Sequence, residues 1–153
     1  MTNMQLIVFN LEEQHYGVEI DYVNGINKVK DFKIIKIPNC PDYIEGMINL
    51  RGKVIPLYNL RKRFFNQDSI CQDNEILIVF MRNTLVGLIV DEVFDIIKLE
   101  EEDIESAVNL FTNVDGRFID SIGKKDDNMI IILDVKSILS LVEQQVPPDS
   151  LEE

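Results

Sequence analysis

The residues of this 153-residue chain that could do acid–base or nucleophilic chemistry are scattered along it. The only histidine, His15, falls at the mouth of an expected hairpin, and no Ser or Cys follows it in a recognisable nucleophile context. The carboxylate pairs Glu12-Glu13 and Asp126-Asp127 fall at expected turn tips, whereas general acid–base catalysis needs a partly desolvated cleft. Catalysis is therefore the weaker hypothesis, and a small enzyme that uses acidic residues is kept as an alternative.

Neither the cysteines nor the acidic and glycine-containing runs have the spacing of a metal or cofactor site. Cys40 and Cys71 lie far apart in the chain, and one histidine cannot complete a zinc cluster with them. We expect two free thiols in a reducing cytosol. Glu100–Asp103 lacks the glycine and ligand spacing of a calcium loop, and Gly123-Lys124-Lys125 lacks the glycine-rich loop and the Ser or Thr of a phosphate-binding site. We therefore predict no metal and no cofactor.

The elements that position these residues are predicted to be mostly strands. Ile and Val are abundant and Ala occurs once, a balance that favours sheet over helix. Two short helices are expected, over Leu60–Phe65 with Asn59 as cap and over Val135–Val142 with Asp134 as cap, followed by a flexible tail over 143–153. The expected strands are Gln5–Leu11, Tyr16–Ile20, Lys33–Ile37, Met47–Leu50, Lys53–Tyr58, Glu75–Met81, Leu85–Val90, Val93–Leu99, Val108–Val114, Arg117–Ile122 and Met129–Leu133.

The two halves of the chain share a weak internal repeat, in which a tripeptide and four other residues of the first half recur in the same order in the second. Chance matching of Ile- and Val-rich strands is the alternative, but two matched segments in the same order favour duplication. We therefore predict a mainly β fold of two small β-barrel subdomains, over about residues 5–70 and 71–142. The matched residues are Ile7-Val8-Phe9 with Ile78-Val79-Phe80, and Gly17, Asp21, Val23 and Ile26 with Gly87, Asp91, Val93 and Ile96.

Charge is divided unevenly between the halves. Residues 1–75 hold nine basic and ten acidic groups, and residues 76–153 hold six basic and seventeen acidic groups. The second half would repel nucleic acid and an anionic membrane surface. A nucleic-acid-binding barrel would need an aromatic-lined basic groove, whereas the one basic cluster, Arg61–Arg63, lies on a single short helix. With no signal-peptide pattern and no apolar run long enough to span a membrane, we expect a soluble cytoplasmic protein.

One stretch of the first half carries a more specific signal than composition does. It runs from an isoleucine-proline turn through an asparagine-leucine-arginine-glycine hairpin to a short basic helix. On this stretch, and on weaker matches near both ends, the chain resembles the CheW family, the coupling proteins of bacterial chemotaxis, over roughly residues 5–142. The residues that carry the resemblance are Ile37-Pro38-Asn39, Met47-Ile48-Asn49-Leu50-Arg51-Gly52, Val54-Ile55-Pro56-Leu57, Leu60–Phe64 and Val86–Val93.

The resemblance implies a single CheW-like domain of two five-stranded β-barrels that exchange segments, with a short C-terminal helix. It also implies a function without catalysis, that of a scaffold coupling transmembrane chemoreceptors to the histidine kinase CheA. The implied partners are the regulatory domain of the kinase and the cytoplasmic tip of methyl-accepting chemoreceptors. We then expect a protein that is monomeric when free, is recruited to membrane-associated receptor arrays, and neither enters the membrane nor binds nucleic acid. An alternative is the same adaptor in a non-flagellar chemosensory system.

The resemblance assigns receptor binding to Arg51, Val23, Gly46, Val86 and Gly87. The Arg51 guanidinium could hold a carboxylate or carbonyls of a partner helix, with Asn49 bracing the turn. The glycines would permit close approach of a helix and the valines would line an apolar floor. From one sequence, a solvated turn for Arg51 and simple core packing for the others remain open.

The resemblance assigns kinase binding to Ile34, Ile35 and Ile37 on one edge and to Leu110 and Phe111 on the second barrel. Core burial of alternate residues is the other reading of the isoleucine run.

Two residues depart from the family pattern. Gly25 stands where many relatives carry an acidic residue, which puts one polar contact in doubt. Asn59 stands where aspartate is usual, although asparagine can still cap a helix.

Overall fold

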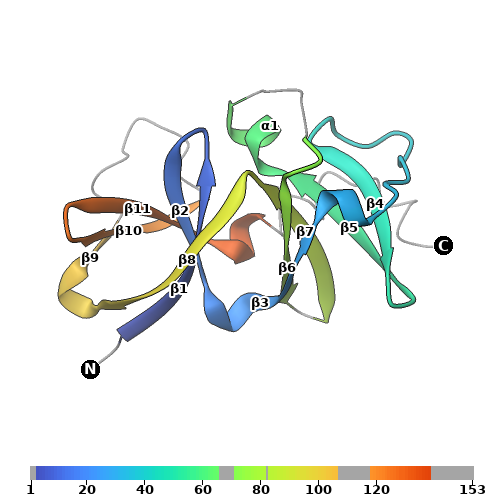
Figure 1. Cartoon of the computed structure of the whole chain (residues 1–153). Coiled ribbons are helices and arrows are strands. Elements are labelled where there is room, and N and C mark those ends of the chain that lie inside the picture. Colours follow the sequence, from blue (N-terminus) through green and yellow to red (C-terminus); the bar gives the residue numbers. More distant parts are fainter. Residues whose placement is uncertain (1–2, 66–70, 82, 107–117, 139–153) are drawn as a thin grey trace.

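The computed structural model describes residues 3–65, 71–81, 83–106 and 118–138 (Figure 1). The expected strand 108–114, Leu110, Phe111 and the tail 143–153 lie outside the described residues. Within the described ranges, no helix is long and apolar enough to cross a membrane.

The strands form two sheets that lie side by side (Figure 1). The six-stranded sheet has the order β8-β1-β2-β11-β10-β9, and the five-stranded sheet has the order β3-β6-β7-β5-β4. The described helical segments are short. They are α1 (Leu60–Phe65), the 3₁₀ turns η1 (Ile20–Tyr22), η2 (Val29–Asp31) and η3 (Glu101–Asp103), and residues 135–138. The strands are β1 (Asn3–Leu11), β2 (Gln14–Glu19), β3 (Val23–Lys28), β4 (Ile44–Leu50), β5 (Lys53–Asn59), β6 (Glu75–Met81), β7 (Thr84–Val90), β8 (Glu92–Glu100), β9 (Ile104–Ser106), β10 (Ile119–Lys125) and β11 (Asn128–Leu133).

The predicted class, mainly β in two β units, is confirmed, but the sheets are open where closed five-stranded barrels were expected. In the described part of the chain, no pairing joins β8 to β9 or β3 to β4, the strands at the ends of the two orders. Closure would need a long strand beyond β10 and another beyond β4, and the described residues supply little there. β9 is three residues long, and the segment before β4 contributes a single bridge, Ile35 to Met47. The strand expected over 33–37 is therefore wrong except at Ile35.

Each sheet takes strands from both halves of the chain. After the β1–β2 hairpin the chain crosses into the other sheet, where β3 pairs with β6. After the β6–β7 hairpin it crosses back, and β8 pairs with β1. A division near residue 70 therefore does not coincide with the division between the sheets, and the two sheets are linked by two crossings.

The pairing registers repeat between the sheets with a constant offset along the chain. Ile7 lies opposite Val18 in one hairpin, and Leu77 lies opposite Leu88 in the other. The β1–β8 and β6–β3 pairs each carry a bulge at the equivalent place, next to Val93 and Val23. The repeat is thus structural. In the structure Ile7 is equivalent to Leu77, and not to Ile78. The tripeptide match proposed from the sequence, Ile7-Val8-Phe9 with Ile78-Val79-Phe80, is therefore wrong by one position.

Tight turns close the hairpins, and three of them are two-residue tips with both residues at positive φ. The tips are Glu12-Glu13, Arg51-Gly52 and Asp126-Asp127. This backbone twist matches that of the flanking strands, which is why two-residue hairpins favour it. The carboxylate pairs that the sequence offered for acid–base chemistry therefore stand on turn tips.

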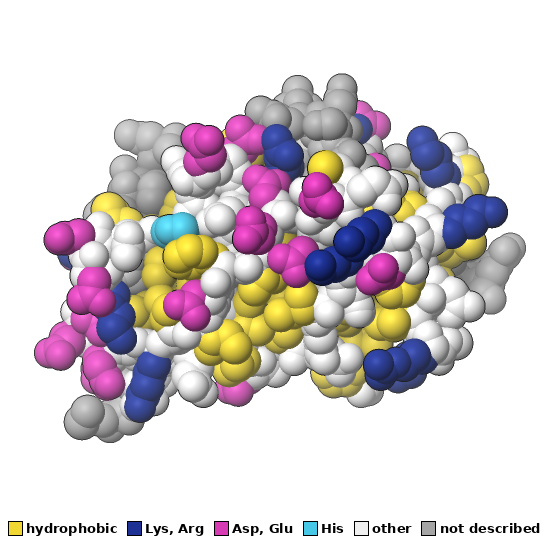
Figure 2. Space-filling view, viewed as in Figure 1, with side chains coloured by type: hydrophobic (Ala, Val, Ile, Leu, Met, Phe, Trp, Pro, Cys, Tyr) yellow, Lys and Arg dark blue, Asp and Glu magenta, His cyan; other side chains and the backbone are white. Residues whose placement is uncertain are grey.

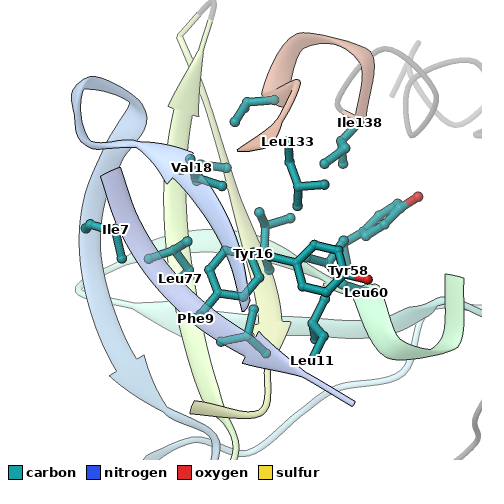
Figure 3. Packing of buried hydrophobic residues seen from close by; sticks show 14 of the residues in the cluster. Ile7, Phe9, Leu11, Tyr16, Val18, Tyr58, Leu60, Leu77, Leu133 and Ile138 are labelled. Carbon is teal, nitrogen blue, oxygen red and sulfur yellow. The ribbon is translucent and has the colours of Figure 1, made fainter. Parts of the chain in front are cut away.

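Three apolar clusters hold the fold together. The central core lies between the sheets and draws on both of them, as the labelled side chains in Figure 3 show by pointing toward one another. A second cluster, which includes Ile55, Leu57 and Ile76, packs against the five-stranded sheet. A third cluster, which includes Leu6, Val8 and Ile132, packs against the six-stranded sheet. Two sheets with a shared core explain why the chain is so rich in Ile and Val.

Candidate partner-binding surfaces

Arg51 stands at the exposed tip of the β4–β5 hairpin. It adopts φ 54° and Gly52 adopts φ 84°, so the tip projects the arginine side chain from a tight turn. The Asn49 side-chain oxygen accepts a hydrogen bond from the Gly52 N–H at 2.9 Å. The expected bracing of the turn by Asn49 is confirmed. A cation held on a braced tip is accessible to a partner carboxylate.

Three other residues assigned to receptor binding are buried. Val86 belongs to the central core. A Cβ on Gly87 would lie 2.6 Å from a Leu57 methyl group, and a Cβ on Gly46 would lie 2.3 Å from the Ile35 carbonyl oxygen. These glycines admit the chain's own side chains and backbone, so the structure does not bring them to the surface with Arg51.

Val23 borders an apolar area on the two strands that follow the crossings. Ile26 is 42% exposed and Ile96 is 53% exposed, while Val23 and Val93 are half-buried against the central core. We call Val23, Ile26, Val93 and Ile96 the central apolar surface. Sequence reasoning missed Ile26 and Ile96 as surface residues, although the repeat had already paired them.

Strand pairing shows that the two exposed isoleucines border the same core. Ile26 lies opposite Leu77 and Ile96 lies opposite Ile7, and paired residues share a face of their sheet. Leu77 and Ile7 are both in the central core. Figure 2 shows apolar side chains gathered across the middle of the visible face, with acidic groups around them. An exposed apolar area of this kind is typical of a protein-binding surface.

The isoleucine run of residues 34–37 is divided by burial. Ile34 packs against the cluster of the five-stranded sheet, and Ile37 is half-buried. Ile35 is 47% exposed and exchanges two backbone hydrogen bonds with Met47, of 2.9 and 2.8 Å. Of the three, Ile35 is therefore the residue most accessible to a partner.

Ile35 belongs to a row of apolar side chains that crosses the sheet edge. Met47 lies opposite both Ile35 and Pro56, and Val54, 66% exposed, lies two residues before Pro56 on β5. Successive partners across strands and alternate residues along a strand share one face. We call Ile35, Met47, Val54 and Pro56 the edge strip. Sequence reasoning missed all but Ile35, because the strip appears only once the strands are paired.

The basic residues of α1 are engaged within the protein. Arg61 pairs with Glu12 at 2.5 Å and with Asp91 at 3.4 Å. The Arg63 guanidinium lies 5.3 Å from the ring centre of Tyr43 and 4.7 Å from that of Phe118. Burial raises the pKa of Tyr58 to about 12, although the cation of Arg63 opposes this rise. These contacts leave little of the cluster available to a phosphate backbone.

Three cavities bear on the alternative of an enzyme, and one of them, of about 360 Å³, has His15, Asp95 and Asp126 in its lining. A cavity of about 310 Å³ under α1 is lined mainly by aromatic and aliphatic groups, including Tyr16, Phe64 and Phe118. Another, of about 330 Å³, has two carboxylates in its lining, Glu19 and Asp21. Burial first, and then the charges of Asp120 and Asp21, raise the pKa of Glu19.

Comparison with known proteins gives a consistent result. The family model described as CheW-like domain matches residues 5–143. A chemotaxis protein CheW of Bacillus subtilis (strain 168) is 33% identical over 145 residues, which are 94% of this chain and 92% of the relative. A chemotaxis protein CheW of Treponema pallidum (strain Nichols) is 31% identical over 146 residues, or 92% of this chain and 85% of the relative.

A solved structure agrees with this result. The crystal structure of the scaffolding protein TtCheW from Thermoanaerobacter tengcongensis superposes with a TM-score of 0.79 and 41% identity. The match covers 87% of this chain and 90% of the other.

Proposed function

Because the chain belongs to the family of CheW-like domains, we propose that it is a scaffold that couples chemoreceptors to the chemotaxis histidine kinase CheA. The observation that carries the proposal is the family match across residues 5–143, which spans both sheets. The solved relative of similar fold is itself named a scaffolding protein. A protein of this kind works by binding, so the proposal includes no catalytic step and no cofactor.

The receptor side of the proposal combines a charged tip with an apolar area. The tip of a chemoreceptor is helical, and an amphipathic helix binds by laying its apolar face on an apolar surface. The central apolar surface offers Val23 and the exposed isoleucines Ile26 and Ile96 for that face. Arg51 offers a guanidinium for a carboxylate of the receptor. Gly46, Val86 and Gly87 contribute indirectly, by allowing the strands beneath to pack.

The kinase side of the proposal is the edge strip. A row of exposed apolar groups at a sheet edge is an aggregation hazard unless a partner covers it. The regulatory domain of CheA would cover Ile35 and Val54. Ile34 and Ile37 would support Ile35 from behind. Leu110 and Phe111 stay a prediction for a second kinase contact.

The remaining properties follow from the same role. The free protein is proposed to be monomeric and cytoplasmic, and to reach membrane-associated receptor arrays through its partners. The same adaptor in a non-flagellar chemosensory system is the alternative. Replacement of the native adaptor in cells that swim and in cells that use another chemosensory output distinguishes the two.

Pull-down and calorimetry test the two sides separately. The intact chain is expected to bind both a CheA regulatory domain and a receptor-tip helical hairpin, and the absence of both at tens of micromolar overturns the proposal. Ile35→Asp is expected to abolish kinase binding and keep receptor binding, and Ile96→Asp the reverse. Met129→Asp is the matched control, because Met129 is a comparably exposed apolar residue outside both surfaces. Loss of either partner in this control would show that the effects are non-specific.

A further inference from the structure

The central apolar surface has two walls, and the chain enters each wall through a crossing between the sheets. One wall is β8, entered at Asp91, and the other is β3, entered through η1. The internal repeat makes the crossings equivalent, with Asp91 matching Asp21 and Val93 matching Val23. Because the two crossings are equivalent, the hydrogen bonds and ion pairs found at one and not at the other show which strand, β8 or β3, is held more firmly.

The crossing into β8 is held by carboxylates. One Asp91 oxygen accepts the Glu12 N–H at 3.0 Å, and the other pairs with Arg61. The Asp91 N–H donates to the Asn10 carbonyl at 3.1 Å, which joins the crossing to the β1–β2 hairpin. Hydrogen bonds to ionised groups are roughly twice as strong as neutral ones.

A second carboxylate holds the first residues of β8 itself. Glu75, at the start of β6 in the other sheet, accepts the Val93 N–H at 2.8 Å. Asp95 accepts the N–H of Ile96 at 2.8 Å, within the strand. Both apolar residues of this wall therefore donate their N–H to a carboxylate, Val93 to one on the other sheet and Ile96 to the exposed side chain of the preceding residue.

The crossing into β3 has no such support among the described residues. Val23 donates its N–H to the Ile20 carbonyl within a tight turn, and η1 has no side-chain cap. The positions that match Glu75 and Asp95 are Gln5 and Gly25, and Asp21 is exposed. A Cβ on Gly25 would meet nothing within 4 Å, so no packing requires glycine there. Glycine in a strand interior weakens the strand, because it leaves the backbone more freedom.

We propose that Glu75 and Asp91 are positioning residues that fix the β8 wall of the receptor-binding surface, whereas the β3 wall adjusts when a receptor helix binds. This inference rests on the proposed function for the identity of the ligand. The asymmetry itself belongs to the free protein. Segments with few fixed backbone groups open locally at lower free energy, and a preorganised part of a binding surface lowers the entropic cost of binding.

Amide hydrogen exchange on the intact free chain tests the asymmetry without any partner. The Val93 and Ile96 amides are expected to exchange at least about tenfold more slowly than the equivalent Val23 and Ile26 amides. Equal or reversed rates would overturn the inference even if receptor binding is established. Glu75→Gln is expected to raise exchange at Val93 about tenfold, and Gly25→Ala, for which there is space, to slow exchange at Ile26.

Binding to a receptor-tip helical hairpin tests the role in positioning. Glu75→Gln and Asp91→Asn are each expected to weaken receptor binding about tenfold and leave binding of the CheA regulatory domain unchanged. Asp103→Asn is the matched control, because Asp103 makes the same type of carboxylate–backbone bond to Glu100 in η3. Parallel loss of both partners in the variants would mean that these carboxylates serve stability alone. A wild-type chain that binds no receptor hairpin contradicts the proposed function and leaves the exchange result to stand by itself.

Discussion

The six-stranded and five-stranded sheets have equivalent pairing registers but carry opposite chemistry at equivalent places. The β4–β5 tip is Arg51-Gly52, and the matching β10–β11 tip is Asp126-Asp127. The exposed Ile35 of one sheet edge corresponds to Glu105 of the other, each bridged to the neighbouring strand. Pairing and bulges are retained where they hold the sheets, while surface residues differ. One scaffold used twice therefore carries different surface chemistry on its two sheets.

The largest expected effect comes from making β4 resemble β10. Gly46 and Ser121 are equivalent, since each adjoins the bulge of its hairpin. Gly46→Ser should cost about 3 kcal/mol or more of unfolding free energy, because φ is 144° and the Ile35 carbonyl fills the space. Ser121→Gly should cost only about 1 kcal/mol. Urea unfolding followed by circular dichroism gives the unfolding free energy of both variants. A loss of stability in Gly46→Ser no larger than that in Ser121→Gly would contradict the close approach of the Ile35 carbonyl to Gly46.

The helix caps give the next largest difference. Asn59 caps α1 through the Lys62 N–H at 3.2 Å and donates to Glu45 at 2.8 Å. Asn59→Asp keeps the cap but sets a carboxylate against Glu45, which should cost about 1–3 kcal/mol at pH 7.

The pH dependence gives the caps a second test. Repulsion from Glu45 would raise the folded-state pKa of the new carboxyl, so the cost of Asn59→Asp is present at neutral pH and disappears as pH falls. The reciprocal control is Asp134→Asn, since Asp134 accepts the Ser137 N–H in the matching helix. Equal unfolding midpoints for the two variants at pH 7 would argue against a role for the Glu45 bond.

The two hairpin tips test which tip contacts the receptor. Arg51→Ala should weaken binding of a receptor-tip hairpin about tenfold, because a charge-assisted contact is lost. Asp126→Ala should leave it unchanged. The pair is well matched, as both residues begin a two-residue tip at φ 54° and 52°. Titration calorimetry measures the affinity of both variants for the receptor-tip hairpin. If circular dichroism shows that Arg51→Ala is unfolded, Arg51 has a structural role instead.

The smallest effect is expected at Glu19, whose equivalent in the other sheet is the buried Ile89. Burial and neighbouring acids raise the pKa of Glu19, so its ionisation opposes folding. Glu19→Gln should therefore raise the melting temperature slightly at pH 7. The gain should shrink as pH falls and the wild-type carboxyl takes up its proton. Receptor–kinase coupling should be unaffected, whereas its loss would favour a chemical role for the cavity with Asp21.

Hairpins were predictable because their signals are local. Arg51-Gly52 and Glu12-Glu13 stand between apolar runs, and the strands around both were found. Asn59 was also recognised as a cap from sequence alone. The boundaries failed where a polar segment pairs. The expected loop after Ile122 is mostly strand, because β10 continues to Lys125 and the turn takes only two residues.

The partner-binding surfaces were less predictable, since they depend on which strands become neighbours. A glycine in a strand indicates that another group packs closely against the backbone, but the sequence does not show whether that group belongs to the chain itself or to a partner. Gly46 and Gly87 admit the chain itself, although the resemblance had placed a helix against them. The exposure of Ile26 and Ile96 follows from pairing between segments far apart in sequence, which no local pattern contains.

The exchange of strands between the sheets also governs when the protein can begin to fold. β1 lies between β2 and β8, and β2 lies between β1 and β11, so the first hairpin waits for β8 and then for β11, the last strand of the two sheets. Contacts so distant along the chain carry a large entropic cost of loop closure and slow the folding reaction. On the ribosome, the β1–β2 hairpin gains its second neighbour, β11, only when nearly the whole domain has emerged. The same linkage ties the two partner surfaces to one cooperative folding event.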